Sequence, residues 1–333
     1  MNQAVWLTGP RGEITVAAAP PTEPGSGEVT VRMEACGICH SDVMIAGLEK
    51  LPLSPVVLGH EGIGVVEYIG AGVSNVATGE RVGITYLASG CGACEACREG
   101  RVRFCLKQGN HGFTRHGALA QVAVVAAQNL IRVPDELTAE EAAPLCCAGW
   151  TAYGAVRESG LRSGQLLAVF GFGGLGHLAL PYARNVGARV AVVDISEEKL
   201  DFARSLGADS AVRGEDARNT LLKGYGGADA AIVFTASAAA VPLAFSCLKR
   251  GGTLVLVGMS MDTFSFSMTE VVLKGIRIQG SYLGTRADLE HVFTLAAAGV
   301  AKPHVQGHPL QAAPELIGKL RRGELVGRAV VRF

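Results

Sequence analysis

Cysteine and histidine residues gather in four short segments whose spacing could hold metal ions. CGICHSD, residues 36–42, places two cysteines three positions apart with a histidine directly behind them. CGACEACREGRVRFC, residues 91–105, contains four cysteines. GHEGIG, residues 59–64, offers a histidine beside a glutamate, and LCCAGWTAY, residues 145–153, offers adjacent cysteines. In a chain that is not secreted, clustered cysteines bind metal more often than they form disulfides.

The segment at residues 91–105 supplies enough thiolates for a complete metal shell. Four sulfurs can close a tetrahedral Zn²⁺ site without outside help. An iron–sulfur cluster also uses four cysteines, but its usual spacings differ. A filled shell leaves no place for a substrate, so we expect a structural zinc. The expected ligands are Cys91, Cys94, Cys97 and Cys105.

The other three segments could together form a second metal site. A catalytic zinc takes three protein ligands and keeps one coordination position open. Spacing alone does not decide which side chains would serve. The candidates are Cys36, Cys39, His40, His60, Glu61, Cys146 and Cys147.

A glycine-rich loop, GFGGLG at residues 171–176, indicates a dinucleotide site. It follows an apolar strand and opens a helix, so its backbone N–H groups can meet a pyrophosphate. Asp194 closes the next strand, where a carboxylate accepts hydrogen bonds from the adenosine ribose and repels a 2′-phosphate. We therefore expect NAD rather than NADP. The expected loop residues are Gly171, Gly173, Gly174, Leu175 and Gly176.

The elements that must position these residues fall into two kinds. EVTVRMEA, residues 28–35, alternates apolar and polar side chains and predicts a strand with one wet face. Short glycine-rich strands at residues 61–70, 80–85 and 119–125 predict a barrel-like β domain. TAEE, residues 138–141, offers a helix capping box.

From residue 165 onward, apolar strands alternate with helical patterns. This alternation predicts a buried parallel sheet that is doubly wound. Ser196 is expected to cap the helix that follows Asp194. A helix from about Arg286, a helix near 314–322 and a last strand in GRAVVRF are expected in the tail. The six predicted strands are residues 165–170, 189–194, 209–212, 229–234, 253–258 and 276–282.

Composition bounds the remaining possibilities. A length of 333 residues predicts about two domains, and 49% hydrophobic residues suit a buried core. Thirty basic and thirty acidic residues cancel, which is unlike a nucleic-acid-binding protein. The uncharged stretch 230–248 contains a proline and hydroxyl residues, so a strand and a core helix explain it better than a membrane span. The N-terminus does not resemble a signal peptide, and we expect a cytoplasmic protein.

Through these motifs and their order along the sequence, the chain resembles the zinc-dependent alcohol dehydrogenases of the medium-chain dehydrogenase/reductase family. The resemblance is greatest to the bacterial ethanol- or propanol-type branch. The resemblance implies an α/β fold: a GroES-like β-barrel catalytic domain at 1–147 and 285–333, and a Rossmann NAD-binding domain at 148–284. It implies reversible hydride transfer between NAD⁺ and a small primary or secondary alcohol, two zinc ions per chain, and a homotetramer or homodimer. The motifs that carry it are CGICHSD, GHEGIGVV, GERV, the four-cysteine segment, CAGWTAY, GFGGLGHLAL, VVDISEEKL, KRGG, GSYLGTRADL and GRAVVRF.

The resemblance also assigns the catalytic metal site. Cys39, His60 and Cys147 match the family's zinc ligands, and two cysteines with one histidine is the set known for alcohol dehydrogenases. Glu61 matches an acidic neighbour that enters the metal shell transiently. Asp42 would accept the second N–H of His60. Cys36 and Cys146 would then be small buried side chains.

Further roles follow from the resemblance. Ser41 matches the hydroxyl that takes the alcohol proton and passes it to the cofactor ribose. Many members end this relay at a histidine, but this chain has Met44 there, which puts the exit of the proton in doubt. The expected cofactor contacts are His40 and Arg328 at the pyrophosphate, Lys199 beside Asp194 at the ribose, and Thr151 at the nicotinamide.

Three alternatives remain at this point. A zinc polyol or sugar dehydrogenase of the same superfamily often lacks the third ligand, so Cys147 argues against it. A quinone reductase of this fold needs no zinc ligands, whereas this chain carries a full set. A non-catalytic NAD- or zinc-binding module would not need Ser41. Several residues are expected to have no chemical role, namely His177, which begins the loop helix, and His111 and His116, which lie in a loop.

Overall fold

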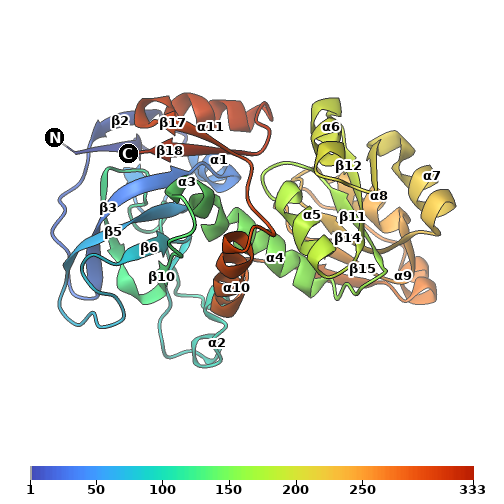
Figure 1. Ribbon diagram of the computed structural model, residues 1–333, viewed down its shortest axis with the longest axis horizontal. Helices are drawn as coiled ribbons and strands as arrows, with labels where there is room; N and C mark the ends of the chain where they lie inside the picture. The colour runs from blue at the N-terminus through green and yellow to red at the C-terminus, as the bar shows by residue number, and fades with distance from the viewer. Residues whose placement is uncertain (1) are drawn as a thin grey trace. The chain divides into compact units, whose positions relative to one another are not determined.

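The computed structural model describes residues 2–333, which form two compact units (Figure 1). Unit 1 comprises Met1–Ala148 and Thr285–Phe333, and unit 2 comprises Gly149–Gly284. Unit 1 is therefore built from both ends of the chain, and unit 2 is inserted between them.

Unit 1 is dominated by a seven-stranded sheet of order β10-β6-β5-β3-β18-β17, in which β9 also pairs with β3. The last strand of the chain, β18, runs antiparallel to β3 and places Val330 opposite Gly37. The C-terminal strand thus lies beside the end of the strand that leads into the CGICHSD segment. The strands are β3 (Glu28–Gly37), β5 (Gly62–Ile69), β6 (Arg81–Ile84), β9 (Val122–Ala126), β10 (Ile131–Arg132), β17 (Val305–Pro309) and β18 (Arg328–Arg332).

Smaller elements complete unit 1. A three-stranded sheet has the order β2-β1-β4, and β7 pairs with β8. The short strands are β1 (Gln3–Leu7), β2 (Ile14–Ala18), β4 (Val56–Val57), β7 (Leu87–Ser89) and β8 (Gly109–Asn110). The helices are α1 (His40–Ala46), α2 (Glu95–Arg98), α3 (Ala139–Ala142), α10 (Arg286–Ala297) and α11 (Ala313–Arg321), with 3₁₀ turns η1 (Val102–Phe104), η2 (Ala127–Asn129), η3 (Ala143–Cys146) and η4 (Leu310–Ala312).

The strand predicted at residues 28–35 is confirmed as β3, but its second face is drier than expected. Val29, Val31 and Met33 are buried on one side, as the alternation predicts. On the other side Arg32 is exposed, whereas Thr30 is buried. Its hydroxyl donates a hydrogen bond to the carbonyl oxygen of Thr22 at 2.6 Å, so the segment before the strand covers this position.

Unit 2 contains the doubly wound sheet that the alternating pattern predicts. All six strands are present and parallel, in the order β13-β12-β11-β14-β15-β16. The order reverses between β11 and β14, the kind of switch point at which open α/β sheets bind ligands. The strands are β11 (Leu166–Phe170), β12 (Arg189–Asp194), β13 (Ser210–Arg213), β14 (Ala228–Val233), β15 (Leu248–Leu256) and β16 (Arg277–Gly280).

The helices of unit 2 pack on this sheet, with α5 against β11 and β12, and α8 against β14 and β15 (Figure 1). The uncharged stretch 230–248 is divided among β14, α8 and the start of β15. In residues 2–333 we find no helix with both the length and the apolar character that a membrane span requires. The helices are α4 (Ala148–Glu158), α5 (Gly176–Asn185), α6 (Glu197–Ser205), α7 (Gly214–Tyr225), α8 (Ala240–Ser246) and α9 (Met268–Lys274).

One of the two predicted helix caps is present. Thr138 and Glu141 form the reciprocal capping box at the start of α3. Ser196 lies at the N-cap of α6, but its side chain makes no capping hydrogen bond, so that prediction is wrong. The backbone N–H of Ser196 donates a hydrogen bond to Asp194 Oδ1 at 3.0 Å.

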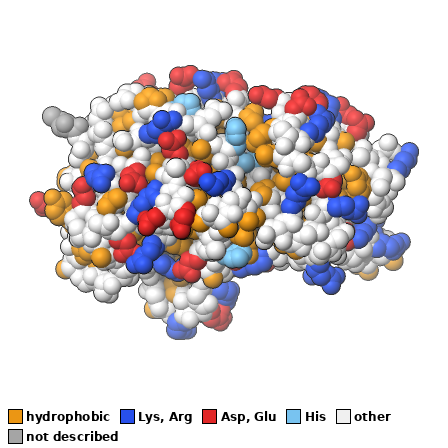
Figure 2. Space-filling view, viewed as in Figure 1, with side chains coloured by type: hydrophobic (Ala, Val, Ile, Leu, Met, Phe, Trp, Pro, Cys, Tyr) orange, Lys and Arg blue, Asp and Glu red, His pale blue; other side chains and the backbone are white. Residues whose placement is uncertain are grey.

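Charged side chains of both signs are interspersed on the face of the molecule drawn in Figure 2. Independently of this view, Glu270 pairs with Lys274 within α9, and Glu315 pairs with Lys319 within α11. This face therefore carries no continuous basic surface.

Candidate metal centres and cofactor site

A buried cluster in unit 1 brings together four of the predicted metal-site residues. The ligand atoms of Cys39, His60, Glu61 and Cys147 all lie within 4.8 Å of one another. Cys39 precedes α1, His60 and Glu61 precede β5, and Cys147 follows η3. The Sγ atoms of Cys39 and Cys147 are 3.9 Å apart. Two sulfurs on a tetrahedral zinc, each at about 2.3 Å, would be about 3.8 Å apart, so the cluster fits this metal.

The imidazole of His60 adds independent support for a metal. Its side chain is completely buried, and within residues 2–333 neither ring nitrogen has a hydrogen-bond partner. Nδ1 lies 3.6 Å from Asp42 Oδ1 and therefore faces that carboxylate. Nε2 is therefore the ring nitrogen that can bind a metal ion. Because buried polar atoms rarely lack a partner, an imidazole in this state fits a metal ligand.

Asp42 connects the two segments that supply Cys39 and His60. Its Oδ2 accepts a hydrogen bond from the Cys39 N–H at 2.9 Å, and its Oδ1 accepts one from the Gly59 N–H at 3.2 Å. Gly59 has a φ of +95°, a conformation that a side chain would strain. One buried carboxylate thus holds the backbone on both sides of the cluster and faces the imidazole.

The titratable side chains of this cluster shift one another's pKa values. The hydrogen bond from the Cys147 thiol lowers the pKa of Cys39 well below its usual value, and the same hydrogen bond together with burial raises the pKa of Cys147. Burial raises the pKa of Glu61 to about 8, although the Arg328 guanidinium opposes this. A metal ion bound by both sulfurs would displace any proton that remains on them.

Glu61 is paired with Arg328, a contact that the sequence reading did not identify. Arg328 Nη2 donates to both carboxylate oxygens of Glu61, at 2.6 and 2.5 Å, and both side chains are buried. A Cβ atom at Gly37 would overlap Glu61 Oε2, so the glycine in CGIC makes room for the carboxylate. Arg328 was expected at the pyrophosphate, and that role stays a prediction.

A second cysteine cluster occupies the segment around α2. The Sγ atoms of Cys91, Cys94, Cys97 and Cys105 lie within 4.8 Å of one another, and those of Cys91 and Cys97 are 4.0 Å apart. Cys91 Sγ accepts from the Cys94 N–H, and Cys105 Sγ accepts from the Cys91 N–H, each at 3.4 Å. Backbone hydrogen bonds lower the pKa of Cys91 to about 6. Four sulfurs at these distances fit a complete tetrahedral zinc shell.

Cys36 and Cys146 are buried outside the two clusters. Neither belongs to a metal-ligand group found among residues 2–333. Burial raises the pKa of both thiols, which keeps them protonated and unsuited to bind a cation.

The glycine-rich loop of unit 2 has the geometry of a phosphate cradle. Gly171 has a φ of +91°, and a Cβ at Gly176 would overlap the carbonyl oxygen of Gly171. A Cβ at Gly173 would meet nothing within 4 Å, so this side of the loop is open. Among residues 2–333, the N–H groups of Gly173, Gly174 and Leu175 have no protein acceptor. Free N–H groups before a helix fit a pyrophosphate.

Asp194 lies beside this loop and is held by backbone donors. Its Oδ2 accepts from the Phe172 N–H at 2.7 Å, and its Oδ1 accepts from the Ile195 N–H at 2.8 Å. The carboxylate is half-buried and retains acceptor capacity for a ribose hydroxyl. Lys199 follows on α6 and is also half-buried.

The remaining predicted residues lie in three environments. His40 is the exposed first residue of α1, and Ser41 Oγ lies 3.7 Å from Cys39 Sγ. Met44 is 37% exposed on the same helix. Thr151 is buried in α4.

An aromatic ring packs against the buried cluster, and a further histidine is buried in unit 1. Tyr86 packs edge-on against the His60 ring, with centroids 5.3 Å apart. His111 was expected to lie in a loop without a role, yet it is buried and its Nδ1 lies 2.8 Å from the Thr85 carbonyl oxygen. Sequence reasoning missed this contact, because nothing near His111 in the chain indicates burial.

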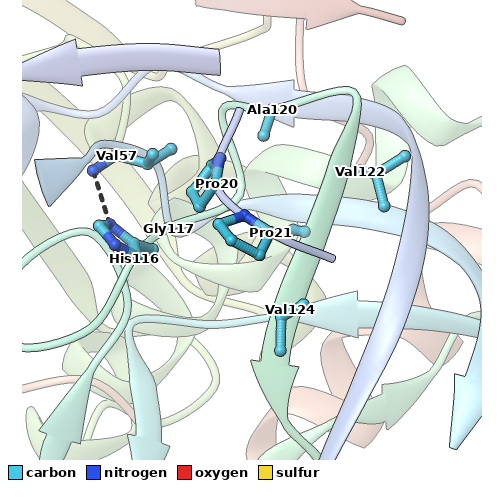
Figure 3. A pocket seen from close by; sticks show the side chains of 9 residues that line it. Pro20, Pro21, Val57, His116, Gly117, Ala120, Val122 and Val124 are labelled. Atoms are coloured by element: carbon cyan, nitrogen blue, oxygen red, sulfur yellow. Dashed lines mark hydrogen bonds between the residues drawn. The ribbon is translucent and has the colours of Figure 1, made fainter. Parts of the chain in front are cut away.

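A separate hollow in unit 1 is drawn in Figure 3. Two of its lining residues bind each other, since the Val57 N–H donates a hydrogen bond to His116 Nδ1 at 3.2 Å. Its lining includes none of the residues of the two cysteine clusters or of the glycine-rich loop. The lining residues are Pro20, Pro21, Val57, His116, Gly117, Ala120, Val122, Ala123 and Val124.

Known proteins are similar to this protein over nearly the whole chain. The family model for the alcohol dehydrogenase GroES-like domain matches residues 25–135, and the model for zinc-binding dehydrogenases matches residues 174–298. An alcohol dehydrogenase of Geobacillus stearothermophilus is 40% identical over 313 residues, which is 92% of each chain.

Two solved structures extend the comparison. The alcohol dehydrogenase of Aeropyrum pernix has a TM-score of 0.91 at 31% identity and covers 99% of this chain and 100% of its own. The D-arabinose dehydrogenase of Sulfolobus solfataricus has a TM-score of 0.86 at 26% identity and covers 100% of this chain and 99% of its own. From its sequence relatives, its domain models and its fold, the chain belongs to the zinc-type alcohol dehydrogenases of the medium-chain dehydrogenase/reductase family.

Proposed function

We propose that this enzyme transfers hydride reversibly between NAD⁺ and a small primary or secondary alcohol, giving an aldehyde or ketone. The observation that carries the proposal is the buried group of Cys39, His60 and Cys147, in which the imidazole lacks any hydrogen-bond partner within residues 2–333. When bound there, zinc supplies a Lewis acid for the alcohol oxygen, and NAD⁺ supplies the hydride acceptor.

The protein side chains around this site have distinct tasks. Cys39, His60 and Cys147 hold the metal, and Asp42 fixes the imidazole so that Nε2 faces it. Glu61 is close enough to enter the shell, and Arg328 holds it back through two hydrogen bonds. Ser41 Oγ lies beside Cys39 Sγ and is the group that takes the alcohol proton.

The second cysteine cluster holds a structural zinc, which makes two zinc ions per chain. Its four sulfurs leave no coordination position for a substrate. In this proposal residues 1–147 and 285–333 form the zinc-binding catalytic domain, and residues 148–284 form the NAD-binding domain. The proposed structural ligands are Cys91, Cys94, Cys97 and Cys105.

NAD is the proposed cofactor of unit 2. The open loop at Gly173 suits the pyrophosphate, and Asp194 suits the two hydroxyls of the adenosine ribose. Lys199 is the proposed partner of Asp194 at the ribose. We further assign Thr151 to the nicotinamide, and His40 and Arg328 to the pyrophosphate, from the family pattern.

A second copy of the chain is the proposed partner of unit 2. The edge strand β16 is exposed along its whole length, and α9, which precedes it in the chain and packs on β15, exposes Met268, Val272 and Leu273 by 81, 70 and 66%. An open strand edge with large apolar neighbours favours self-association. This supports a homodimer or homotetramer, which light scattering would measure. Free cysteines, several of them exposed or half-buried, support a reducing, cytoplasmic location.

A zinc polyol or sugar dehydrogenase is the second candidate. The fold of the D-arabinose dehydrogenase supports it. Cys147 argues for the first candidate, since it completes a set of two cysteines and one histidine.

The test combines metal analysis with a substrate survey. We expect about two zinc ions per chain in protein purified without added metal. Turnover with NAD⁺ is then measured over straight-chain, branched and aromatic alcohols and polyols. Highest kcat/KM for a small monohydric alcohol is expected. A preference for polyols would favour the second candidate, and full activity without zinc would overturn the mechanism.

A further inference from the structure

The imidazole of His177, for which the sequence predicts no chemical role, is bound to the glycine-rich loop. Its Nδ1 lies 3.1 Å from the carbonyl oxygen of Gly173, and the His177 backbone N–H donates to the same oxygen at 3.3 Å. Because a carbonyl oxygen only accepts hydrogen bonds, Nδ1 must carry the proton. The side chain therefore binds the middle of the phosphate cradle with a fixed tautomer.

The orientation of this ring is held by packing within unit 2. His177 is 2% exposed at the start of α5, and its ring lies 6.0 Å from that of Phe202 on α6. Phe202 also meets Phe172 of the loop in an edge contact at 5.8 Å. A ring held on this side has little freedom to leave the Gly173 carbonyl.

The hydrogen bond has a consequence for the next N–H group. A peptide unit is planar and trans, so its C=O and N–H bonds point in opposite directions. When His177 draws the Gly173 carbonyl toward the helix, the Gly174 N–H must face away from it. That N–H has no acceptor in the part of the chain that the structure describes, and the Cβ position of Gly173 is open.

We propose that His177 is a positioning residue for the cofactor: its Nδ1–H fixes the Gly173–Gly174 peptide so that the Gly174 N–H meets the pyrophosphate of NAD. This inference rests on the proposed function. Without the imidazole, only the longer backbone hydrogen bond would restrain the peptide. Removing the imidazole should weaken NADH binding by the contribution of one neutral hydrogen bond, which is about fivefold in affinity.

The experiment measures the dissociation constant of NADH by fluorescence for the full-length enzyme and two variants. His177→Leu removes the donor but keeps an apolar side chain. His177→Asn is the matched control, because its amide N–H can replace the Nδ1–H. Adenosine, measured by competition with NADH, has the adenine and ribose but no phosphate, so its binding separates pyrophosphate positioning from general damage.

We expect His177→Leu to raise the dissociation constant of NADH about fivefold and His177→Asn to restore it within about twofold. Adenosine affinity and zinc content should not change. Unchanged NADH binding in His177→Leu, an equal loss of adenosine binding, or no recovery in His177→Asn would each overturn the role of His177. If His177→Leu does not fold, His177→Gln replaces it, since its amide cannot occupy the Nδ1 position. Failure of the unmutated enzyme to bind NADH would overturn the proposed function as well.

Discussion

His111 should make the folded protein sensitive to acid. Its imidazole is 2% exposed and binds the Thr85 carbonyl oxygen through Nδ1. Nε2 has no hydrogen-bond partner among residues 2–333. Burial lowers the pKa of His111 to about 4; the Thr85 carbonyl opposes this, whereas Arg115 lowers the pKa further. The folded state therefore keeps this imidazole neutral.

The sign and size of the effect follow from the two pKa values. A histidine in the unfolded chain has a pKa of about 6.5, above the folded value. Between these values the unfolded chain binds a proton that the folded protein does not, so the free energy of unfolding falls as the pH falls. This decrease in the free energy of unfolding is absent above about pH 7 and reaches about 2 kcal/mol near pH 5. It is complete, at about 3 kcal/mol, below about pH 4.

The assay compares the enzyme with His111→Asn, which keeps an N–H donor for Thr85 but cannot titrate. Urea unfolding with zinc in excess gives the free energy of unfolding at about pH 7 and about pH 5 for both proteins. Acid also protonates metal ligands, and this contribution cancels in the comparison. On going from about pH 7 to about pH 5, we expect the free energy of unfolding to fall by about 2 kcal/mol more in the unmutated enzyme than in the variant. Equal losses would refute the reasoning.

The remaining predictions concern the proposed metal and cofactor sites. Cys39→Ala should lose one zinc and all turnover while folding normally, whereas Cys36→Ala should retain both ions; elemental analysis decides, and loss of zinc from Cys36→Ala would contradict the ligand set. Asp194→Gly should weaken NAD⁺ binding and relieve repulsion of the NADP⁺ 2′-phosphate, measured as the ratio of kcat/KM for the two cofactors; equal use of both by the unmutated enzyme would argue against this role. Met44→His should raise alcohol oxidation modestly and add a titration near about 6.5 to the pH–rate profile, and an unaltered profile would exclude a missing relay step. Ser41→Ala should lower oxidation by about a hundredfold, and intact activity would mean that the proton leaves by another route.

Much of the fold could be predicted because its determinants are local. The six apolar strands of unit 2 and the glycine-rich loop carry patterns that span only a few residues. Side-chain periodicity and φ preferences act over the same distance, so each segment indicates its own conformation. The capping box at Thr138 succeeded for this reason. The cap at Ser196 was predicted from residue type and position alone, and in the structure its hydroxyl makes no capping hydrogen bond.

The candidate site was predictable in its residue types but not in its contacts. Four cysteines within one short segment indicate a metal by themselves, since their sulfurs cannot be far apart. Cys39 and Cys147 are 108 positions apart, and only a resemblance to a known family paired them. The space at Gly37 for the Glu61 carboxylate has no counterpart in the local pattern.

By itself, the sequence determined the two kinds of domain, the strands of the parallel sheet, the glycine-rich loop and the supply of cysteine and histidine side chains. Tertiary structure alone decided that Glu61 meets Arg328, 267 positions away, that His111 is buried against Thr85, and that His177 binds the Gly173 carbonyl. The reason is physical. Backbone preference and side-chain alternation depend on neighbours along the chain, whereas burial, pairing and pKa depend on which distant segments pack together.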